Sequence, residues 1–143
     1  MTVIDADGLV LGRLCTNVAK RLLNGEEVVV LNAEKAIVSG NRAQLFEFYR
    51  HRRKRGKSHL TKGPYYPRTP DRVLKRTVRN MVDYKKPRGR AALKRLKVFI
   101  GVPREFAGAK AETVEGARKP NLVKYVSLGE ISKELGSSQG LMS

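Results

Sequence analysis

The sequence predicts an α/β fold built on a parallel sheet, and three patterns in its first forty residues carry that prediction. A short β-branched run, TVIDA at residues 2–6, is typical of a strand. Apolar residues then recur at helical spacing over residues 11–23. EVVVLN, residues 27–32, is a continuous apolar strand of the kind that is buried on both faces of a parallel sheet. A strand, a helix and a strand in this order favour a right-handed crossover between parallel neighbours.

The next segments predict a short strand, a helix and a loop. KAIVSG, residues 35–40, is the strand. A helix is expected from about Asn41, and its first turns would be anchored in the core by Leu45, Phe46, Phe48 and Tyr49. Its apolar residues then stop, so we expect its C-terminal end to project outward. Residues 56–70 hold too many Gly and Pro for regular structure, which predicts a long loop of the kind that is usually functional or disordered.

A third helix is expected from Thr69 to about Val82. Thr69, Pro70 and Asp71 supply a capping hydroxyl, a proline at the first helical position and an acid in the first turn. The apolar face of this helix would be Val73, Leu74, Val78, Met81 and Val82, and its basic face Arg72, Lys75, Arg76 and Arg79. Further along, residues 91–96 predict another turn or two of helix and residues 97–102 a strand, and residues 124–136 predict a short strand that leads into a helix with Ser127 as N-cap.

Positive charge is concentrated in the middle of the chain. Residues 42–104 hold 21 of the 30 lysines and arginines but three acidic residues, a net charge of +18. The remaining residues hold nine basic and ten acidic side chains, like an ordinary globular domain. The densest part is RHRRKRGK, residues 50–57, in which six of eight side chains are Lys or Arg. Because like charges at helical spacing repel, such a run indicates a polyanionic partner, with nucleic acid favoured over an anionic membrane surface.

Length and composition set the broad class of protein. The chain has 143 residues, which fits one domain, and its formal net charge is +17. A single cysteine, Cys15, excludes an internal disulfide and fits a reducing compartment. No apolar run approaches the roughly 20 residues of a membrane span, and the N-terminus MTVIDADG has no signal-peptide pattern. We therefore expect a cytoplasmic protein with no membrane partner.

Few residues offer catalytic chemistry. Asp5 and Asp7 follow the first strand and Glu34 follows the next, so these carboxylates could hold Mg²⁺ for phosphoryl chemistry. Asp and Gly are also ordinary turn residues, so we favour the interpretation that these residues form turns rather than a metal site. His51 and His59 have no Cys or acid nearby at metal-ligand spacing. We expect no catalytic residue, no metal site, no cofactor and no small-molecule substrate.

The basic segment carries the functional prediction. Lys and Arg neutralise phosphates and release counterions, and Tyr65 and Tyr66 lie in a Pro- and Gly-rich loop, as side chains that stack on single-stranded RNA do. RNA is favoured over DNA because the chain has no zinc-finger, basic-zipper or homeodomain pattern. The predicted RNA-binding residues are Arg50, Arg52, Arg53, Lys54, Arg55, Lys57, Lys62, Tyr65, Tyr66, Arg68, Arg72, Arg76, Arg79, Lys85, Lys86, Arg88, Arg90, Lys94 and Lys97.

Two alternatives stay open on the residues alone. A metal-dependent RNA-processing enzyme would use Asp5, Asp7 and Glu34. A peripheral membrane protein would need apolar anchors exposed beside the charges, whereas Phe46 and Phe48 are expected in the core.

Three long motifs resemble one protein family. VIDADGLVLGRLCTNVAKRLLNGEEVVVLNAEKAIVSGN, residues 3–41, is similar to the opening of the L-thirteen family of large-subunit ribosomal proteins. RTVRNMVDYKKPRGRAALKRLKVFIGVP, residues 76–103, resembles the signature region of that family. RRKRGKSHLTKGPYYPRTPDRVLKRTVR, residues 52–79, is similar to its archaeal and eukaryotic branch. The resemblance covers residues 3–104 closely and residues 120–136 loosely.

The resemblance implies a three-layer α/β/α fold with a four-stranded parallel sheet and a basic helical and loop insertion. It also implies a structural constituent of the large ribosomal subunit that binds the rRNA of that subunit, acts early in assembly and contacts neighbouring ribosomal proteins. The C-terminus is shorter than in the eukaryotic members, so an archaeal source is expected. One domain is expected, with a β-α-β platform at 1–41, a basic RNA-facing segment at 42–97, a closing strand and C-terminal elements at 98–136 and a flexible tail at 137–143.

Overall fold

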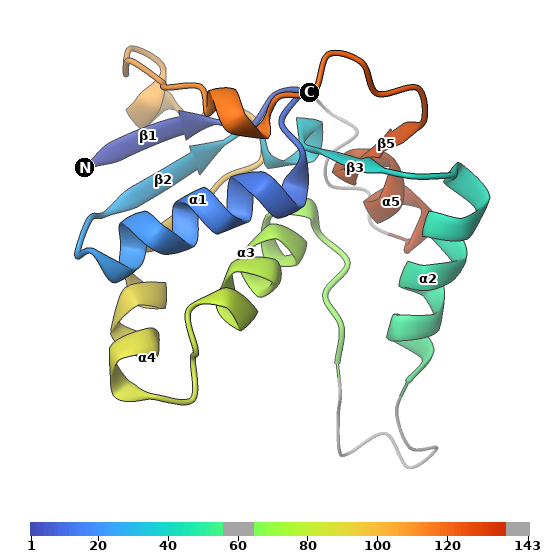
Figure 1. Ribbon diagram of the computed structural model, residues 1–143, viewed down its shortest axis with the longest axis horizontal. Coiled ribbons are helices and arrows are strands. Elements are labelled where there is room, and N and C mark those ends of the chain that lie inside the picture. Colours follow the sequence, from blue (N-terminus) through green and yellow to red (C-terminus); the bar gives the residue numbers. More distant parts are fainter. Residues whose placement is uncertain (56–64, 137–143) are drawn as a thin grey trace.

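A small parallel sheet lies at the centre of a mixed α/β fold, and the computed structural model describes residues 1–55 and 65–136 (Figure 1). The sheet has the order β1-β2-β4, with β1 (Thr2–Asp5), β2 (Val28–Leu31) and β4 (Leu96–Val98) all parallel. Helix α1 (Leu11–Leu23) connects β1 to β2, so the predicted strand-helix-strand unit is confirmed. All four residues of β2 are buried, as its continuous apolar run predicts.

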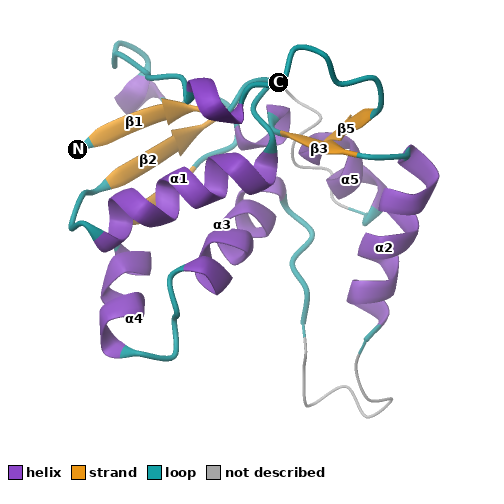
Figure 2. Ribbon diagram, viewed as in Figure 1, coloured by secondary structure: helices purple, strands orange, loops and turns teal. Residues whose placement is uncertain are grey.

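Helices cover one face of the sheet (Figure 2). Helix α3 (Pro70–Met81) packs on α1, and α4 (Pro87–Lys94) contacts both of them. The main core lies between these helices and the sheet, where Leu14 of α1 and Leu74 of α3 are fully buried. This core buries most of the apolar faces that the 3.6-residue periodicity of α1 and α3 predicts. The expectation that Met81 belongs to the buried face is wrong, because Met81 is the last residue of α3 and is 40% exposed there.

The opposite face of the sheet carries a smaller apolar cluster. Val3, Val29 and Leu31 pack there with Phe99 and Phe106. Phe106 belongs to a 3-10 helix, η2 (Arg104–Phe106), and its ring centroid lies 5.6 Å from that of Phe99. The resemblance implies a layer of helices on this face as well. Within the described residues, a single 3-10 turn contributes to the packing here, so that helical layer is not confirmed.

The expected fourth parallel strand is not found in the described part of the chain. Strand β3 (Ile37–Ser39) forms a separate antiparallel pair with β5 (Tyr125–Ser127). After β2, Asn32 adopts a left-handed conformation with φ 56°, and the 3-10 helix η1 (Ala33–Lys35) follows. This turn redirects the chain, so β3 leaves the plane of the parallel sheet.

Helix α2 (Arg42–Lys54) contacts α5 (Leu128–Glu134) and lies to one side of the fold (Figure 1). Tyr49 is the buried residue of α2, whereas Phe48 is 50% exposed. The expectation that Phe48 lies in the core is therefore wrong. Consecutive helical residues are about 100° apart, so one of these two aromatic neighbours faces solvent when the other is buried. Two other predicted anchors are partly buried against the core, Leu45 and Phe46.

Some predictions fall outside the described residues. Most of the predicted loop, with Lys57, His59 and Lys62, lies in residues 56–64, and the predicted tail is residues 137–143. The 3-10 helix η3 (Glu115–Ala117) completes the set of elements in the described ranges. Among these described residues, no helix combines the length and apolar character that a membrane crossing requires.

Candidate nucleic-acid interface

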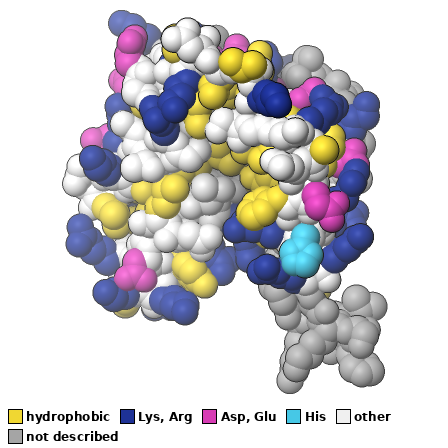
Figure 3. All heavy atoms as spheres, turned by 45° about the vertical axis from the view of Figure 1, so that its right-hand side comes forward, with side chains coloured by type: hydrophobic (Ala, Val, Ile, Leu, Met, Phe, Trp, Pro, Cys, Tyr) yellow, Lys and Arg dark blue, Asp and Glu magenta, His cyan; other side chains and the backbone are white. Residues whose placement is uncertain are grey.

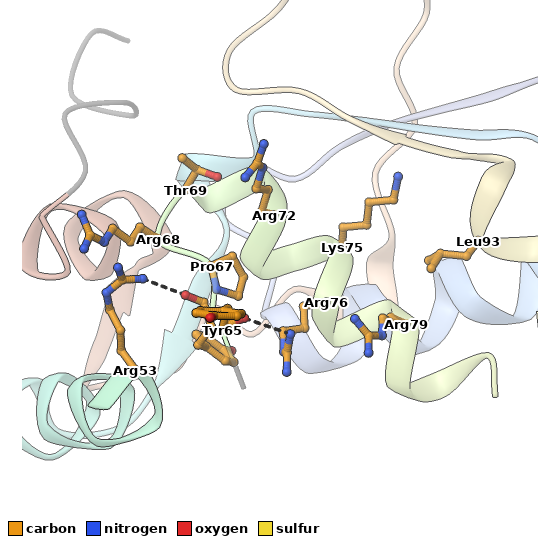
Figure 4. A pocket seen from close by; sticks show the side chains of 11 residues that line it. Arg53, Tyr65, Pro67, Arg68, Thr69, Arg72, Lys75, Arg76, Arg79 and Leu93 are labelled. Carbon is orange, nitrogen blue, oxygen red and sulfur yellow. Dashed lines mark hydrogen bonds between the residues drawn. The ribbon is translucent and has the colours of Figure 1, made fainter. Parts of the chain in front are cut away.

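Four cationic side chains of α3, together with Arg53 of α2 and Arg68, line one hollow, which we call the basic groove. Its volume is about 630 Å³, and its lining holds six Lys and Arg side chains and no acidic one. The groove extends from the end of α2, along residues 65–69 and α3, to one residue of α4 (Figure 4). Its lining residues are Arg53, Tyr65, Tyr66, Pro67, Arg68, Thr69, Arg72, Lys75, Arg76, Arg79 and Leu93.

Helix α3 forms one wall of the basic groove. The helix begins at Pro70 with Thr69 as N-cap, as predicted, although the Thr69 side chain makes no capping hydrogen bond. The apolar face of α3 packs into the core, so its basic residues, spaced three and four apart, share the open face. Val73, Leu74 and Val78 are buried, whereas Arg72, Lys75, Arg76 and Arg79 line the groove.

Two arginines from opposite walls hold the floor of the groove. Arg53 of α2 donates a hydrogen bond to the carbonyl oxygen of Tyr66 at 2.7 Å. Arg76 of α3 donates one to the carbonyl oxygen of Tyr65 at 3.4 Å (Figure 4). Partial burial, and then the positive charge of Arg68, lower the pKa of Arg53. Because like charges crowd this end of the groove, a bound anion would stabilise it.

The two adjacent tyrosines have different environments. Tyr65 is 65% exposed and lies in the lining of the groove, so its ring is accessible to a ligand. Tyr66 is 9% exposed and lies 6.1 Å from the Tyr49 ring, centroid to centroid. The guanidinium groups of Arg52 and Arg76 lie 5.4 and 5.1 Å from the Tyr66 ring centroid. Of the two predicted stacking residues, Tyr65 is therefore the one whose ring the fold presents.

The turn between α3 and α4 displays a second set of cations. Asp83 has φ 57°, which reverses the chain after α3. The guanidinium of Arg79 lies 4.0 Å from the Tyr84 ring centroid, and its hydrogen bond and charge lower the pKa of Tyr84. Arg88 donates to the carbonyl oxygen of Leu23, at the end of α1, at 3.5 Å. The other predicted RNA-binding residues from here to β4 are exposed: Lys85, Lys86, Arg90, Lys94 and Lys97.

The basic run at the end of α2 is used in two ways. Arg50 forms an ion pair with Glu134 of α5, and Arg52 donates a hydrogen bond to the Tyr66 hydroxyl at 3.3 Å while it covers the Phe48 ring at 4.6 Å. Lys54 and Arg55 are exposed, and no ion pair is found for them among the described residues. Lys and Arg side chains gather around this end of α2 on the face drawn in Figure 3.

The predicted site residues omitted several groups that the groove uses. Lys75 lies in the lining of the groove, and its place on the basic face of α3, three residues after Arg72, was a usable signal. Pro67 and Leu93 add apolar surface to the lining. No pattern in the sequence indicates that residue 93, on α4, reaches a groove formed mainly by residues 65–69 and α3.

The carboxylates that could have held a metal stabilise turns. One Asp5 carboxylate oxygen accepts hydrogen bonds from the Asn32 side-chain amide at 2.9 Å and from the Asp7 backbone N–H at 3.0 Å. Glu34 is 3% exposed and accepts a hydrogen bond from the Gly101 backbone N–H at 2.9 Å. Within residues 1–55 and 65–136, no three His, Cys, Asp or Glu side chains are grouped as metal ligands would be. These contacts support the turn interpretation.

Comparison with known proteins decides the family. A family model described as "Ribosomal protein L13" matches residues 1–105. This chain belongs to the ribosomal protein L13 family. Its relatives include "Large ribosomal subunit protein uL13" of Methanococcoides burtonii, which is 52% identical over 96% of this chain and 99% of the relative. The protein of the same name from Archaeoglobus fulgidus is 51% identical over 94% of this chain and 87% of the relative.

The family match ends at residue 105, whereas the relatives align with nearly the whole chain. The family match ends one residue before the last residue of η2. The Methanocaldococcus jannaschii relative, again named "Large ribosomal subunit protein uL13", is 45% identical over 96% of this chain and 98% of its own length. The resemblance to this family and to its archaeal and eukaryotic branch is therefore confirmed by archaeal relatives.

Proposed function

We propose that this L13-family chain is a structural constituent of the large ribosomal subunit and that it binds the rRNA of that subunit through the basic groove and the exposed cations beside it. The observation that carries the proposal is the lining of the groove, with six cations and no acid. An inert protein surface normally has both signs interspersed. The relatives named as large-subunit proteins match nearly the whole chain, which supports the assignment.

Binding follows from charge neutralisation and shape. Each phosphate that contacts a Lys or Arg releases condensed counterions, so affinity falls as salt rises, with a log–log slope of about −0.7 to −0.9 per phosphate. The role is structural: the protein holds rRNA segments together, early in assembly, and contacts neighbouring ribosomal proteins. The proposed RNA-binding residues are those predicted from the sequence, with Lys75 added and with Tyr66 assigned to support the floor of the groove.

The division of labour along the chain is part of the proposal. Residues 1–41 act as a platform, residues 42–97 face the RNA and residues 98–136 close the fold. We also propose that the sheet gains its fourth strand at the free edge of β1. Glu112 supports this, because it makes a parallel bridge with Ile4. Its backbone carbonyl accepts a hydrogen bond from the Asp5 N–H at 3.0 Å, and its backbone N–H donates one to the Val3 carbonyl at 2.8 Å.

Sedimentation tests the proposal. A tagged copy is expressed in an archaeal host, and gently lysed cells are separated on sucrose gradients in low and in high salt. We expect the tagged chain to migrate with the large subunit and to stay there in high salt. A charge variant with Arg68→Gln, Arg72→Gln and Lys75→Gln should incorporate less. A control with the same loss of charge, Lys20→Gln, Lys119→Gln and Lys124→Gln, should incorporate normally. Release of the unmodified chain at moderate salt would contradict an integral ribosomal role.

A further inference from the structure

The basic groove has the form of a nucleotide pocket as well as a charged surface. A duplex presents a convex phosphate backbone, which exposed side chains on a ridge or rod can neutralise. The groove is a hollow of about 630 Å³, within the range of small-molecule sites. Its lining combines cations with the apolar surfaces of Tyr65, Pro67 and Leu93. A base needs such an apolar surface, whereas a phosphate does not.

The floor of this hollow is held from both sides. Arg53 and Arg76 hydrogen bond to the carbonyl oxygens of Tyr66 and Tyr65, so residues 65 and 66 are tied to α2 and to α3. Below the surface, Tyr66 is buried and contacts the guanidinium groups of Arg52 and Arg76. The buried tyrosine therefore supports its exposed neighbour. Because the backbone that carries Tyr65 is held in place, only the side-chain torsions of Tyr65 remain to be ordered when a base stacks on its ring.

The cations around the floor are suited to the phosphates on either side of such a base. Arg72 and Lys75 are exposed on α3, in the lining of the groove, and Arg68 lies at its other end (Figure 4). The Nε atom of Arg79, also in the lining, is buried and has no hydrogen-bond partner in the described structure. Because it is buried, this donor is not available to a ligand, and the phosphates are left to the exposed side chains of Arg68, Arg72 and Lys75.

We infer that the basic groove binds one unpaired nucleotide, extruded from an RNA helix or loop, with its base against Tyr65 and its flanking phosphates on Arg72 and Lys75. The inference rests on the proposed rRNA-binding function and deepens it, because it assigns to the groove a preference for unpaired over fully paired RNA. Stacking on an aromatic ring tolerates any base. The preference is therefore for an unpaired residue and not for a particular sequence.

Two RNA hairpins test the inference on the full chain. One is fully paired, and the other is identical except for a single bulged 2-aminopurine nucleotide in the stem. We expect the bulged hairpin to bind about tenfold more tightly at equal salt, and the 2-aminopurine fluorescence to fall on binding as the base stacks. Tyr65→Ala should remove both the preference and the fluorescence change, whereas Tyr65→Phe should keep them.

The control variant is Tyr125→Ala, which removes another exposed tyrosine, 55% exposed on β5 and outside the lining of the groove. It should change neither readout, and circular dichroism checks that all variants are folded. Equal affinity for the two hairpins, or a preference that survives Tyr65→Ala, would overturn the nucleotide pocket and leave rRNA binding intact. Failure of both hairpins to bind in a salt-dependent way would instead overturn the proposed function, and the pocket with it.

Discussion

Gly89 in the first turn of α4 packs directly against the carbonyl oxygen of Asp83, so closely that a Cβ atom at position 89 would overlap with it and with the Val82 carbonyl. Asp83 has φ 57°, and this left-handed residue brings the first turn of α4 onto the end of α3. The contact sets how the cations of this turn lie relative to α3.

Gly89→Ala should therefore destabilise the protein. In an open helix the same substitution stabilises by about 1 kcal/mol, but here the added methyl group meets backbone atoms that cannot move aside. We expect the free energy of unfolding to fall by about 2 kcal/mol, measured by urea denaturation. Gly108→Ala is the control, because nothing lies within 4 Å of a Cβ at that position. A stabilised Gly89→Ala variant would show that the turn is looser than the structure indicates.

The adjacent tyrosines should differ in their effect on stability. Tyr66→Ala removes a buried ring that contacts two guanidinium groups and Tyr49, so we expect a loss of about 3 kcal/mol in the free energy of unfolding. Tyr65→Ala truncates an exposed ring and should change the same quantity by less than about 0.5 kcal/mol. Thermal and urea unfolding of the two variants measure the contrast. Equal losses would mean that Tyr65 supports the fold as well.

The exposed cations of α3 should account for a definite part of the salt dependence. Arg72→Gln with Lys75→Gln removes two proposed phosphate contacts, so the log–log slope of RNA affinity against salt should become less steep by about 1.4 to 1.8. Binding to the bulged hairpin in a series of salt concentrations measures this slope. Lys119→Gln with Lys124→Gln removes the same charge outside the groove and should leave the slope unchanged. If both double variants changed the slope alike, net charge rather than the groove would govern binding.

Alkaline pH should destabilise the fold through its buried thiol. Burial raises the pKa of Cys15 from its ordinary value of 9.0 to about 12. Between these values the unfolded chain has lost the thiol proton and the folded chain keeps it. The contribution of this thiol to the free energy of unfolding is therefore constant below pH 9 and declines toward pH 12. The decline due to this group approaches about 1.4 kcal/mol per pH unit.

Urea unfolding from pH 8 to pH 11 checks this pH dependence. Cys15→Ala should reduce the slope above pH 9. A smaller decline should remain above pH 10, because burial and the neighbouring Tyr66 raise the pKa of Tyr49 from 10.0 to about 12. An unchanged slope in Cys15→Ala would rule out the thiol as its source.

Two helix N-caps should differ although both carry a hydroxyl. The Ser127 hydroxyl accepts a hydrogen bond from the Glu130 N–H at 3.3 Å, and the Glu130 carboxylate accepts one from the Ser127 N–H at 3.2 Å. Ser127→Ala should therefore lower the free energy of unfolding by about 1 kcal/mol. The Thr69 hydroxyl is buried without a partner in the described structure, so Thr69→Val should be close to neutral. Urea denaturation of both variants shows whether hydroxyl capping stabilises both α3 and α5 or α5 alone.

The elements with strong local patterns could be predicted from the amino-acid sequence. The strand-helix-strand unit, the start of α3 at Pro70 and the Ser127 cap all follow from periodicity and capping chemistry, which act over a few residues. The sign and place of the charge were also readable, because 21 of the 30 basic residues lie within residues 42–104. These features do not depend on which elements become neighbours in space.

Which side chains contact one another could be seen in the folded structure alone. Tyr65 and Tyr66 look equivalent in the sequence, but Tyr66 is buried because Tyr49 of α2 and Arg76 of α3 close around it from distant parts of the chain. The sequence predicts a strand at β3 but not its partner, and the turn at Asn32 directs it to β5, some ninety residues away. Pairing and burial of this kind depend on contacts between segments far apart in the chain, and no local pattern encodes them.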